Sequence, residues 1–303
     1  MTFRQFLSVV EIRTKVISVS TYLLATLYTA AAGYDVAAVP ALLLAVTVLC
    51  VDMGTTAFNT FYDYVRGVDT PLLTVEPDKV LVHEGVAPAH VFLVSGALYL
   101  AAAVGGIAVA AMSSWWIIPA GIAGMVVGFL YNGGPLPISR TPVGELFAGG
   151  FLGTVLFLVV FGVHTGIVNG EAVRASLPSM FMIAAVLAVN NTCDIKGDRA
   201  AGRRTLAIVL GRRLSVVSIY LLCAAAYGFV ALVGASIRAP LPAGSGVPVA
   251  IMPAAGAAVT LLLLVGMSRR GFSHATKHAN MAAMVRIVVV FTAAYAGTLV
   301  PAL

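Results

Sequence analysis

Two short stretches of this sequence carry amide and carboxylate side chains spaced by one helical turn. Asn59 and Asp63 are four residues apart, and the same pair recurs as Asn190 and Asp194, with Asp198 one further turn on. Residues four apart share one face of a helix, where carboxylates repel each other unless a cation lies between them. Their oxygens suit Mg²⁺, which typically combines one or two carboxylates with substrate phosphate oxygens. The pattern therefore predicts two clusters that together grip a diphosphate through Mg²⁺.

The elements that must position these clusters are long apolar segments. Of the 303 residues, 60% are hydrophobic and 10% are charged, whereas a soluble domain has about 25% charged residues. The mean hydropathy is +1.00. Stretches of about 20 apolar residues span a bilayer as helices. We expect nine of them, at residues 16–34, 38–62, 89–112, 115–131, 143–168, 177–193, 214–236, 247–267 and 279–301. The predicted fold class is an all-α polytopic membrane protein with about nine transmembrane helices in the lipid bilayer.

The two clusters lie four predicted helices apart. An even number of crossings returns the chain to the same side of the membrane, so both clusters should emerge on one face. This predicts a single domain over residues 1–303 that consists of two four-helix halves, at about 16–131 and 143–267. The extra helix at 279–301 joins them around a central cavity, with the site at the junction of the halves.

The basic residues indicate the orientation of the chain. Of the 18 Lys and Arg residues, all except Arg174, Arg238 and Arg286 lie in the N-terminal segment or in the loops on the side of the two clusters. Because Lys and Arg resist translocation, we expect the N-terminus and the site on the cytoplasmic side of the cell inner membrane. The same bias explains the net charge of +6 without a nucleic-acid partner.

The motifs around the first cluster resemble those of the UbiA superfamily of intramembrane prenyltransferases. Its first signature, Asn-Asp-x-x-Asp, is matched by Asn59 and Asp63, with Thr60 in place of the intervening Asp. The branch that prenylates 1,4-dihydroxy-2-naphthoate to make menaquinone often carries Asp-x-x-x-Gly-x-Asp here. Asp63, Gly67 and Asp69 reproduce that pattern.

The second cluster resembles the other signature of the family. Asp-x-x-x-Asp followed by Gly-Lys/Arg-Arg-Thr-Leu is matched by Asp194, Asp198, Gly202, Arg203, Arg204, Thr205 and Leu206. The string YNGGPLP, which begins at Tyr131, is similar to the Tyr- and Pro-rich segment after the family's fourth helix. The resemblance extends from about Arg13 to the end of the chain.

The resemblance implies a reaction and a set of site residues. Family members ionise the allylic C–O bond of a polyprenyl diphosphate, and the resulting carbocation attacks an aromatic acceptor. The implied cofactor is Mg²⁺, which stabilises the departing diphosphate. Asp63, Asp194, Asp198, Asn59 and Asn190 would form the catalytic centre, with Asp69 as a further metal ligand. The diphosphate-binding candidates are Lys79, Arg140, Arg203, Arg204 and Tyr131.

Other polar residues in the same regions are candidates either for the acceptor pocket or for structural and interfacial roles. Asp52 lies on the same helical face as Asn59 and is a candidate for the acceptor pocket, the alternatives being a structural ion pair or a snorkelling group. Asn191 and Tyr62 are further acceptor candidates, although Tyr62 and Tyr131 also suit an interfacial belt. Arg66 and Arg199 are interpreted as solvated or lipid-facing, and the five histidines as interfacial.

Several alternatives stay open. The acceptor could instead be 4-hydroxybenzoate, homogentisate, a tetrapyrrole acid or a non-aromatic compound, and the sequence does not indicate the prenyl chain length. Thr60 and Lys196 occupy positions where relatives have acids, which leaves the number of Mg²⁺ ions open. A cation-coupled secondary transporter could also use acidic helix ends together with the intramembrane residues Asp52 and Arg286. A transporter would, however, place its charges near the middle of the bilayer.

Overall fold

The computed structural model describes residues 1–71, 74, 79–238 and 251–300, and every regular element among them is helical. Each predicted apolar stretch is a helix, so the all-α fold is confirmed. The long helices are α2 (Val16–Ala31), α3 (Ala38–Val65), α5 (Pro88–Met112), α6 (Ile117–Asn132), α9 (Gly170–Cys193), α11 (Leu206–Arg238), α12 (Ile251–Arg270) and α13 (Lys277–Leu299). The stretch at 143–168 forms α7 (Gly144–Ala148), a π-helical segment (Gly149–Val155) and α8 (Leu156–Thr165) in succession. Residues 247–250 and 301 of two predicted stretches lie outside the described residues.

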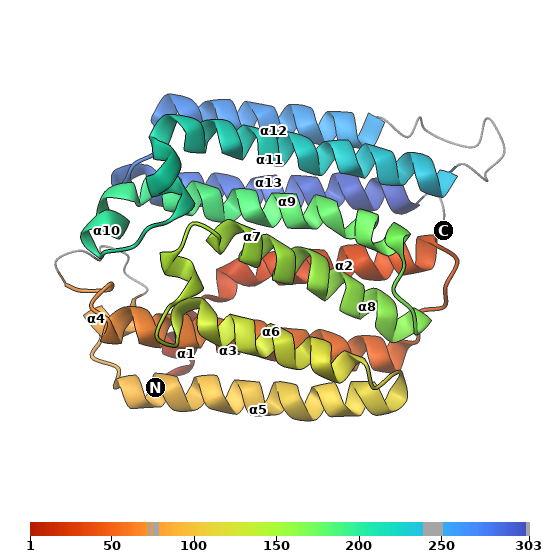
Figure 1. Cartoon of the computed structure of the whole chain (residues 1–303), viewed down its shortest axis with the longest axis horizontal. Helices are drawn as coiled ribbons and strands as arrows, with labels where there is room; N and C mark the ends of the chain where they lie inside the picture. Colours follow the sequence, from red (N-terminus) through yellow and green to blue (C-terminus); the bar gives the residue numbers. More distant parts are fainter. Residues whose placement is uncertain (72–73, 75–78, 239–250, 301–303) are drawn as a thin grey trace.

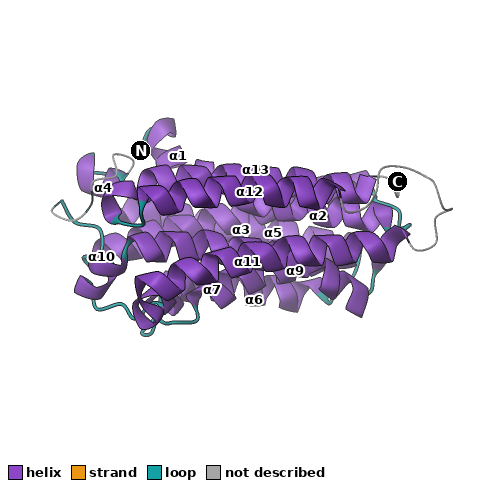
Figure 2. Cartoon of the chain, turned by 90° about the horizontal axis from the view of Figure 1, so that it is seen from above, coloured by secondary structure: helices purple, strands orange, loops and turns teal. Residues whose placement is uncertain are grey.

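Seven of these nine segments are long and apolar enough to cross a membrane. The other two are α2 and α6, each of 16 residues, and α6 is apolar up to its last two residues, Tyr131 and Asn132. The helices run side by side along the long axis of the molecule (Figures 1 and 2). The arrangement is that of a multi-pass membrane protein.

The core lies between α2, α8, α9, α11 and α13. Its largest fully buried side chains include Phe157, Phe161, Met182, Phe291 and Tyr295. Large apolar side chains such as Leu42, Leu100 and Leu262 are exposed on the outside of the bundle. Because lipid tails are apolar, those side chains are suited to a bilayer.

The π-helical segment packs directly on the backbone of α9. A Cβ atom at Gly149 would lie 2.4 Å from the Met180 carbonyl oxygen, and one at Gly153 would lie 2.5 Å from the Met180 Cα. Only glycine permits such close approach of two backbones. This contact fixes the start of the fifth crossing, including Glu145, against the second half of α9.

The short helices gather at one end of the bundle. In Figure 1, α1 (Phe3–Val9), α4 (Val80–His83) and α10 (Ile195–Ala200) lie at the left end, where α3 and α9 also terminate. Both carboxylate clusters therefore emerge on the same face, as the even number of crossings predicts.

Candidate functional site

The first cluster is shaped by the turn that ends α3. Arg66 caps the helix, and Gly67 adopts a left-handed conformation with φ of 68°. The chain then folds back, so that the backbone N–H groups of Val68 and Asp69 both donate to the Asp63 carbonyl, at 2.9 and 3.0 Å. Glycine favours this conformation because it has no Cβ. The Asp-x-x-x-Gly-x-Asp pattern thus brings its second carboxylate back beside the first.

The second cluster is also shaped by a turn with a left-handed glycine. After α10, Gly202 has φ of 70°, and the backbone N–H of Arg203 donates to the Asp198 carbonyl at 2.8 Å. This turn directs the Arg203 side chain back over the cluster.

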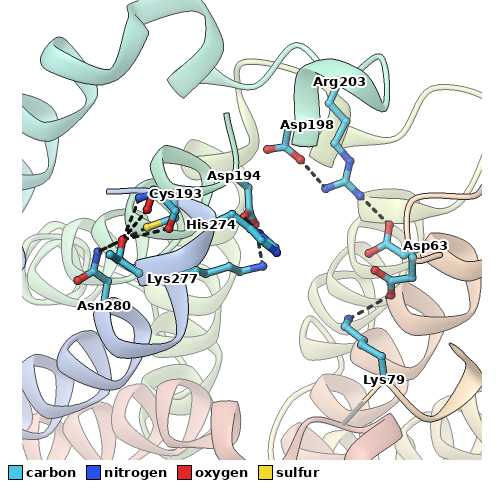
Figure 3. A network of polar contacts seen from close by, with 12 residues as sticks. Asp63, Lys79, Cys193, Asp194, Asp198, Arg203, His274, Lys277 and Asn280 are labelled. Carbon is cyan, nitrogen blue, oxygen red and sulfur yellow. Dashed lines mark hydrogen bonds and ion pairs between the residues drawn. The ribbon is translucent and has the colours of Figure 1, made fainter. Parts of the chain in front are cut away.

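Arg203 joins the two clusters. Its Nη2 lies 2.7 Å from Asp63 Oδ1, and its Nη1 lies 3.4 Å from Asp198 Oδ1 (Figure 3). The ends of α3 and α10 therefore converge, as the sequence predicts. Asn132, at the end of α6, adds a hydrogen bond from Nδ2 to Asp63 Oδ2 at 3.2 Å. Asn132 could not be predicted from the sequence as a site residue, because no spacing links it to either motif.

Lys79 is held among acidic side chains. Its ammonium lies 3.3 Å from Asp69 and 3.4 Å from Glu11. Burial acts to lower the pKa of Lys79, but the carboxylates of Glu11, Asp69 and Asp63 outweigh it and raise the pKa above its usual value. Lys79 is therefore a permanent cation beside the first cluster.

Asp194 faces a different partner. Its carboxylate contacts Lys277, at 2.7 Å, and His274 Nδ1, at 3.2 Å (Figure 3). His274 lies between α12 and α13, and Lys277 is the first residue of α13. The sequence predicts an interfacial position for His274, but it does not predict this contact of the ring with the second cluster. Only the tertiary fold brings residues 80 positions apart together.

Several oxygens of the site fit a metal ion. Asn59 Oδ1 and Asp198 Oδ2 are buried without a hydrogen-bond partner in the described structure. Buried unpartnered oxygens are unfavourable, and a hard cation would satisfy them. Burial raises the pKa of Asp198 despite the opposing effect of Arg203. A divalent cation beside this carboxylate would offset the cost of burying its negative charge. Among the described residues, no three His, Cys, Asp or Glu side chains could hold a metal ion by themselves, so phosphate oxygens would have to complete the coordination.

Arg140 and Arg204 link two loops of the site. Arg140 Nη2 donates to the Ala201 carbonyl at 2.6 Å, and the Arg140 carbonyl accepts from the Arg204 backbone at 2.9 Å. The Arg204 side chain is exposed. The Tyr131 hydroxyl lies beside Gly144 and interacts electrostatically with Asp63, Asp198 and Arg203. These three of the five predicted diphosphate-binding residues thus lie at the polar end, as do Lys79 and Arg203.

Two other predicted residues have internal partners. Asp52 pairs with Lys15 at 2.6 Å and accepts a hydrogen bond from Ser18 at 2.5 Å. Asn191 donates to Glu145 Oε1 at 2.9 Å. The Asp52 contacts are those of a structural pair, the alternative that the sequence left open, and its place in an acceptor pocket stays a prediction.

The remaining residues border the first and second clusters. Asn190 is half-buried in the last turn of α9, and its carbonyl accepts from the Asp194 backbone. Tyr62 packs edge-on against Phe129 and lies under the Arg66 guanidinium. That guanidinium donates to the carbonyls of Asn132 and Gly134. The interpretation of Arg66 as solvated or lipid-facing is therefore wrong.

The two departures from the family pattern lie away from the carboxylates. Thr60 is buried and donates to the Val9 carbonyl at 3.2 Å, which ties α3 to α1. Lys196 is exposed on α10. Neither residue takes part in the contacts between Arg203 and the two clusters.

Comparison with known proteins gives a family for the whole bundle. The model of the "UbiA prenyltransferase family" matches residues 18–297. The chain is 37% identical over 179 residues to the 1,4-dihydroxy-2-naphthoate octaprenyltransferase of Bacillus subtilis. This match covers 59% of this chain and 57% of the relative. It is 29% identical over 170 residues to the protein of that name from Mycobacterium tuberculosis, a match that covers 56% of this chain and 57% of the relative. The chain thus spans little more than half the length of these curated relatives.

Solved structures share the fold. A UbiA homolog from Archaeoglobus fulgidus bound to DMAPP and Mg²⁺ superposes with a TM-score of 0.67 at 15% identity, over 98% of this chain and 99% of that one. A UbiA homolog from Aeropyrum pernix K1 has a TM-score of 0.64 at 18% identity, over 90% of this chain and 96% of that one.

Proposed function

Since this chain belongs to the UbiA prenyltransferase family, we propose that it transfers a polyprenyl group from an isoprenyl diphosphate to an aromatic acceptor. The observation that carries the proposal is the convergence of Asp63 and Asp198 on Arg203, beside buried oxygens without partners. The metal is proposed to be Mg²⁺, held by Asp63, Asp69, Asp194, Asp198 and Asn59, where it would neutralise charge on the leaving diphosphate.

In the proposed reaction the allylic C–O bond breaks and its electron pair leaves with the diphosphate. A ring carbon of the acceptor then bonds to the allylic carbon, and the ring loses a proton. Arg203 is placed to donate two hydrogen bonds to phosphate oxygens, and Lys79 supplies a fixed positive charge. Arg140, Arg204 and Tyr131 line the same end of the bundle and complete the proposed diphosphate site.

Aromatic side chains border this end on the membrane side. Phe58, Phe61, Tyr62 and Phe129 form a chain of edge-to-face contacts along α3 and α6. Their faces would stabilise an allylic cation and keep water away from it.

The proposed acceptor is 1,4-dihydroxy-2-naphthoate, for menaquinone biosynthesis. Two lines support it: the spacing of Asp63, Gly67 and Asp69, and the names of the Bacillus and Mycobacterium relatives. We also propose that Asp52, Asn191 and Tyr62 contribute to the acceptor pocket. Other aromatic or non-aromatic acceptors are the competing possibility for the same chemistry.

We further propose that the polar end faces the cytoplasm at the inner membrane. The excess of Lys and Arg in the N-terminal segment and in the loops at this end supports this orientation. Reporter fusions to the N-terminus test it, since a cytoplasmic reporter should be active and a periplasmic reporter inactive.

The test of the reaction is direct. Purified protein in lipid should release pyrophosphate from a labelled prenyl diphosphate when 1,4-dihydroxy-2-naphthoate and Mg²⁺ are present. Release should vanish with EDTA and in Asp63→Ala or Asp194→Ala, and persist in the control Lys196→Ala. Ion-driven uptake of a solute without pyrophosphate release would instead identify a transporter.

A further inference from the structure

The segment between α12 and α13 brings a basic side chain to the second cluster, although neither family signature includes it. Lys277 Nζ lies 2.7 Å from Asp194 Oδ2 (Figure 3). We propose, on the basis of the function proposed above, that Lys277 is a further diphosphate-binding residue. It holds Asp194 until Mg²⁺ binds that carboxylate, and it then pairs with the oxygens of the diphosphate.

The backbone that carries Lys277 is fixed by hydrogen bonds that do not involve the Lys277 side chain. Gly271 ends α12 with φ of 84°, and the Thr276 hydroxyl donates to its carbonyl at 2.8 Å. The fully buried Asn280 donates to the same carbonyl at 2.9 Å. Ser273 and Thr276 also form a capping box. Loss of the ammonium group should therefore leave the segment folded.

The position of Lys277 is unfavourable for the helix itself. Lys277 is the first residue of α13, and the first turn has no acidic residue. A cation at this end opposes the helix dipole, which favours negative charge there. The pairing with Asp194 compensates, and a bound diphosphate would do so as well.

The ammonium group is accessible. The Lys277 side chain is 24% exposed, whereas that of Lys15, which pairs with Asp52 inside the bundle, is 5% exposed. Lys277 can therefore change partners without unfolding the protein around it.

Arg203 shows the same arrangement in the other half of the site. It pairs with Asp63 and Asp198, two of the proposed metal ligands. Each cluster thus has a protein cation in contact with its carboxylates, and binding of a divalent cation would release both side chains toward the diphosphate. Lys277 contributes this cation from α13, outside the two motif-bearing loops.

The experiment uses the full chain in detergent, with Mn²⁺ as the metal and inorganic pyrophosphate as the ligand. In Lys277→Met, the affinity for Mn²⁺ alone should rise about threefold, because a competing cation is gone. The affinity for pyrophosphate at saturating Mn²⁺ should fall about tenfold, which corresponds to about 1.4 kcal/mol. Electron paramagnetic resonance measures the first quantity, and calorimetry the second.

Two variants serve as controls. Lys196→Met removes an exposed positive charge from α10 and should change either affinity by less than about twofold. Lys277→Arg keeps the charge and should restore most of the pyrophosphate affinity.

A rise in the affinity for Mn²⁺ together with a fall in the affinity for pyrophosphate would show that Lys277 changes partner from Asp194 to the diphosphate. An affinity for Mn²⁺ that is unchanged or weaker in Lys277→Met, or an unchanged affinity for pyrophosphate, would overturn the assignment. A wild-type protein that binds no pyrophosphate with Mn²⁺ would overturn the proposed function itself, and the role of Lys277 with it.

Discussion

Two polar clusters of this protein contain buried carboxylates, yet they are satisfied in different ways. At the polar end, Arg203 reaches Asp63 and Asp198, while Asn59 Oδ1 and Asp198 Oδ2 have no partner in the described structure. Deeper in the bundle, Lys15 and Ser18 contact both oxygens of Asp52, at 2.6 and 2.5 Å. At the polar end, some side-chain oxygens could still bind a cation, whereas both carboxylate oxygens of Asp52 already have partners. Low exposure of a carboxylate therefore does not distinguish the two regions, whereas oxygens without a partner beside a charge do.

The largest effect is expected at the first cluster. Asp63→Asn should lower the rate of prenyl transfer about a thousandfold, because the variant loses a charge that would hold the metal. Thermal stability should change much less than the rate, since the remaining side-chain oxygen still accepts from Arg203 or Asn132 and only one of these two donors loses its acceptor. Rate and melting temperature measured on the same preparation check this. A rate within about tenfold of wild type would remove Asp63 from the catalytic centre.

The opposite pattern is expected at Asp52, which pairs with Lys15 inside the bundle. Asp52→Asn leaves the Lys15 ammonium unpaired inside the bundle, and we expect the free energy of unfolding to fall by about 3 kcal/mol. The double variant Lys15→Met with Asp52→Asn should recover much of that loss. Denaturation in detergent measures both. A loss of turnover at unchanged stability, not restored in the double variant, would instead support the acceptor-pocket role of Asp52.

Arg203 connects the halves of the site and should have an intermediate effect. Arg203→Met removes charge-assisted hydrogen bonds to the diphosphate, which should cost about 2 kcal/mol, or about thirtyfold in kcat/KM for the prenyl diphosphate. Arg203→Lys keeps the positive charge but loses the planar guanidinium that can donate to two oxygens at once, so it should recover only part of the loss. Steady-state kinetics with varied prenyl diphosphate separates the two variants. Equal activity of Arg203→Met and wild type would contradict the role of Arg203.

The smallest effect concerns the packing that supports the site. A Cβ at Gly153 would lie 2.5 Å from the Met180 backbone, whereas one at Gly150 would have no atom within 4 Å. Gly153→Ala should therefore destabilise the protein by about 1–2 kcal/mol, and Gly150→Ala should not. Paired melting curves test the difference, and equal melting temperatures would show that the π-helical segment can shift away from α9.

The sequence predicted the clusters well because their geometry is local. Spacing by four placed Asn59 with Asp63 and Asn190 with Asp194 near the ends of two helices, whereas the turns at Gly67 and Gly202 became evident only in the structure. The contacts of Asn132, His274 and Lys277 with the clusters were not predicted, because they are tertiary contacts between segments far apart in the sequence. No residue near them in the chain indicates such contacts.

Helix boundaries were predicted less well where polar residues enter a helix. The stretch predicted at 177–193 begins at Gly170, since Asn169 caps the helix by accepting from Ala172 at 2.8 Å and the helix continues through Pro178. The stretch predicted at 214–236 is preceded by a short helical segment from Leu206, and a kink at Gly211 with φ of 73° separates the two. Local polarity suggested a loop there, but capping and packing extend the helices.

The most direct test is the affinity for a non-hydrolysable prenyl thiodiphosphate, measured by calorimetry with and without Mg²⁺. Binding by wild type and Asp52→Asn should be at least about tenfold tighter with Mg²⁺, and Asp63→Asn should lose this enhancement. An affinity that Mg²⁺ does not change in wild type, or an enhancement that survives in Asp63→Asn, would contradict a metal-diphosphate site at the polar end of the bundle.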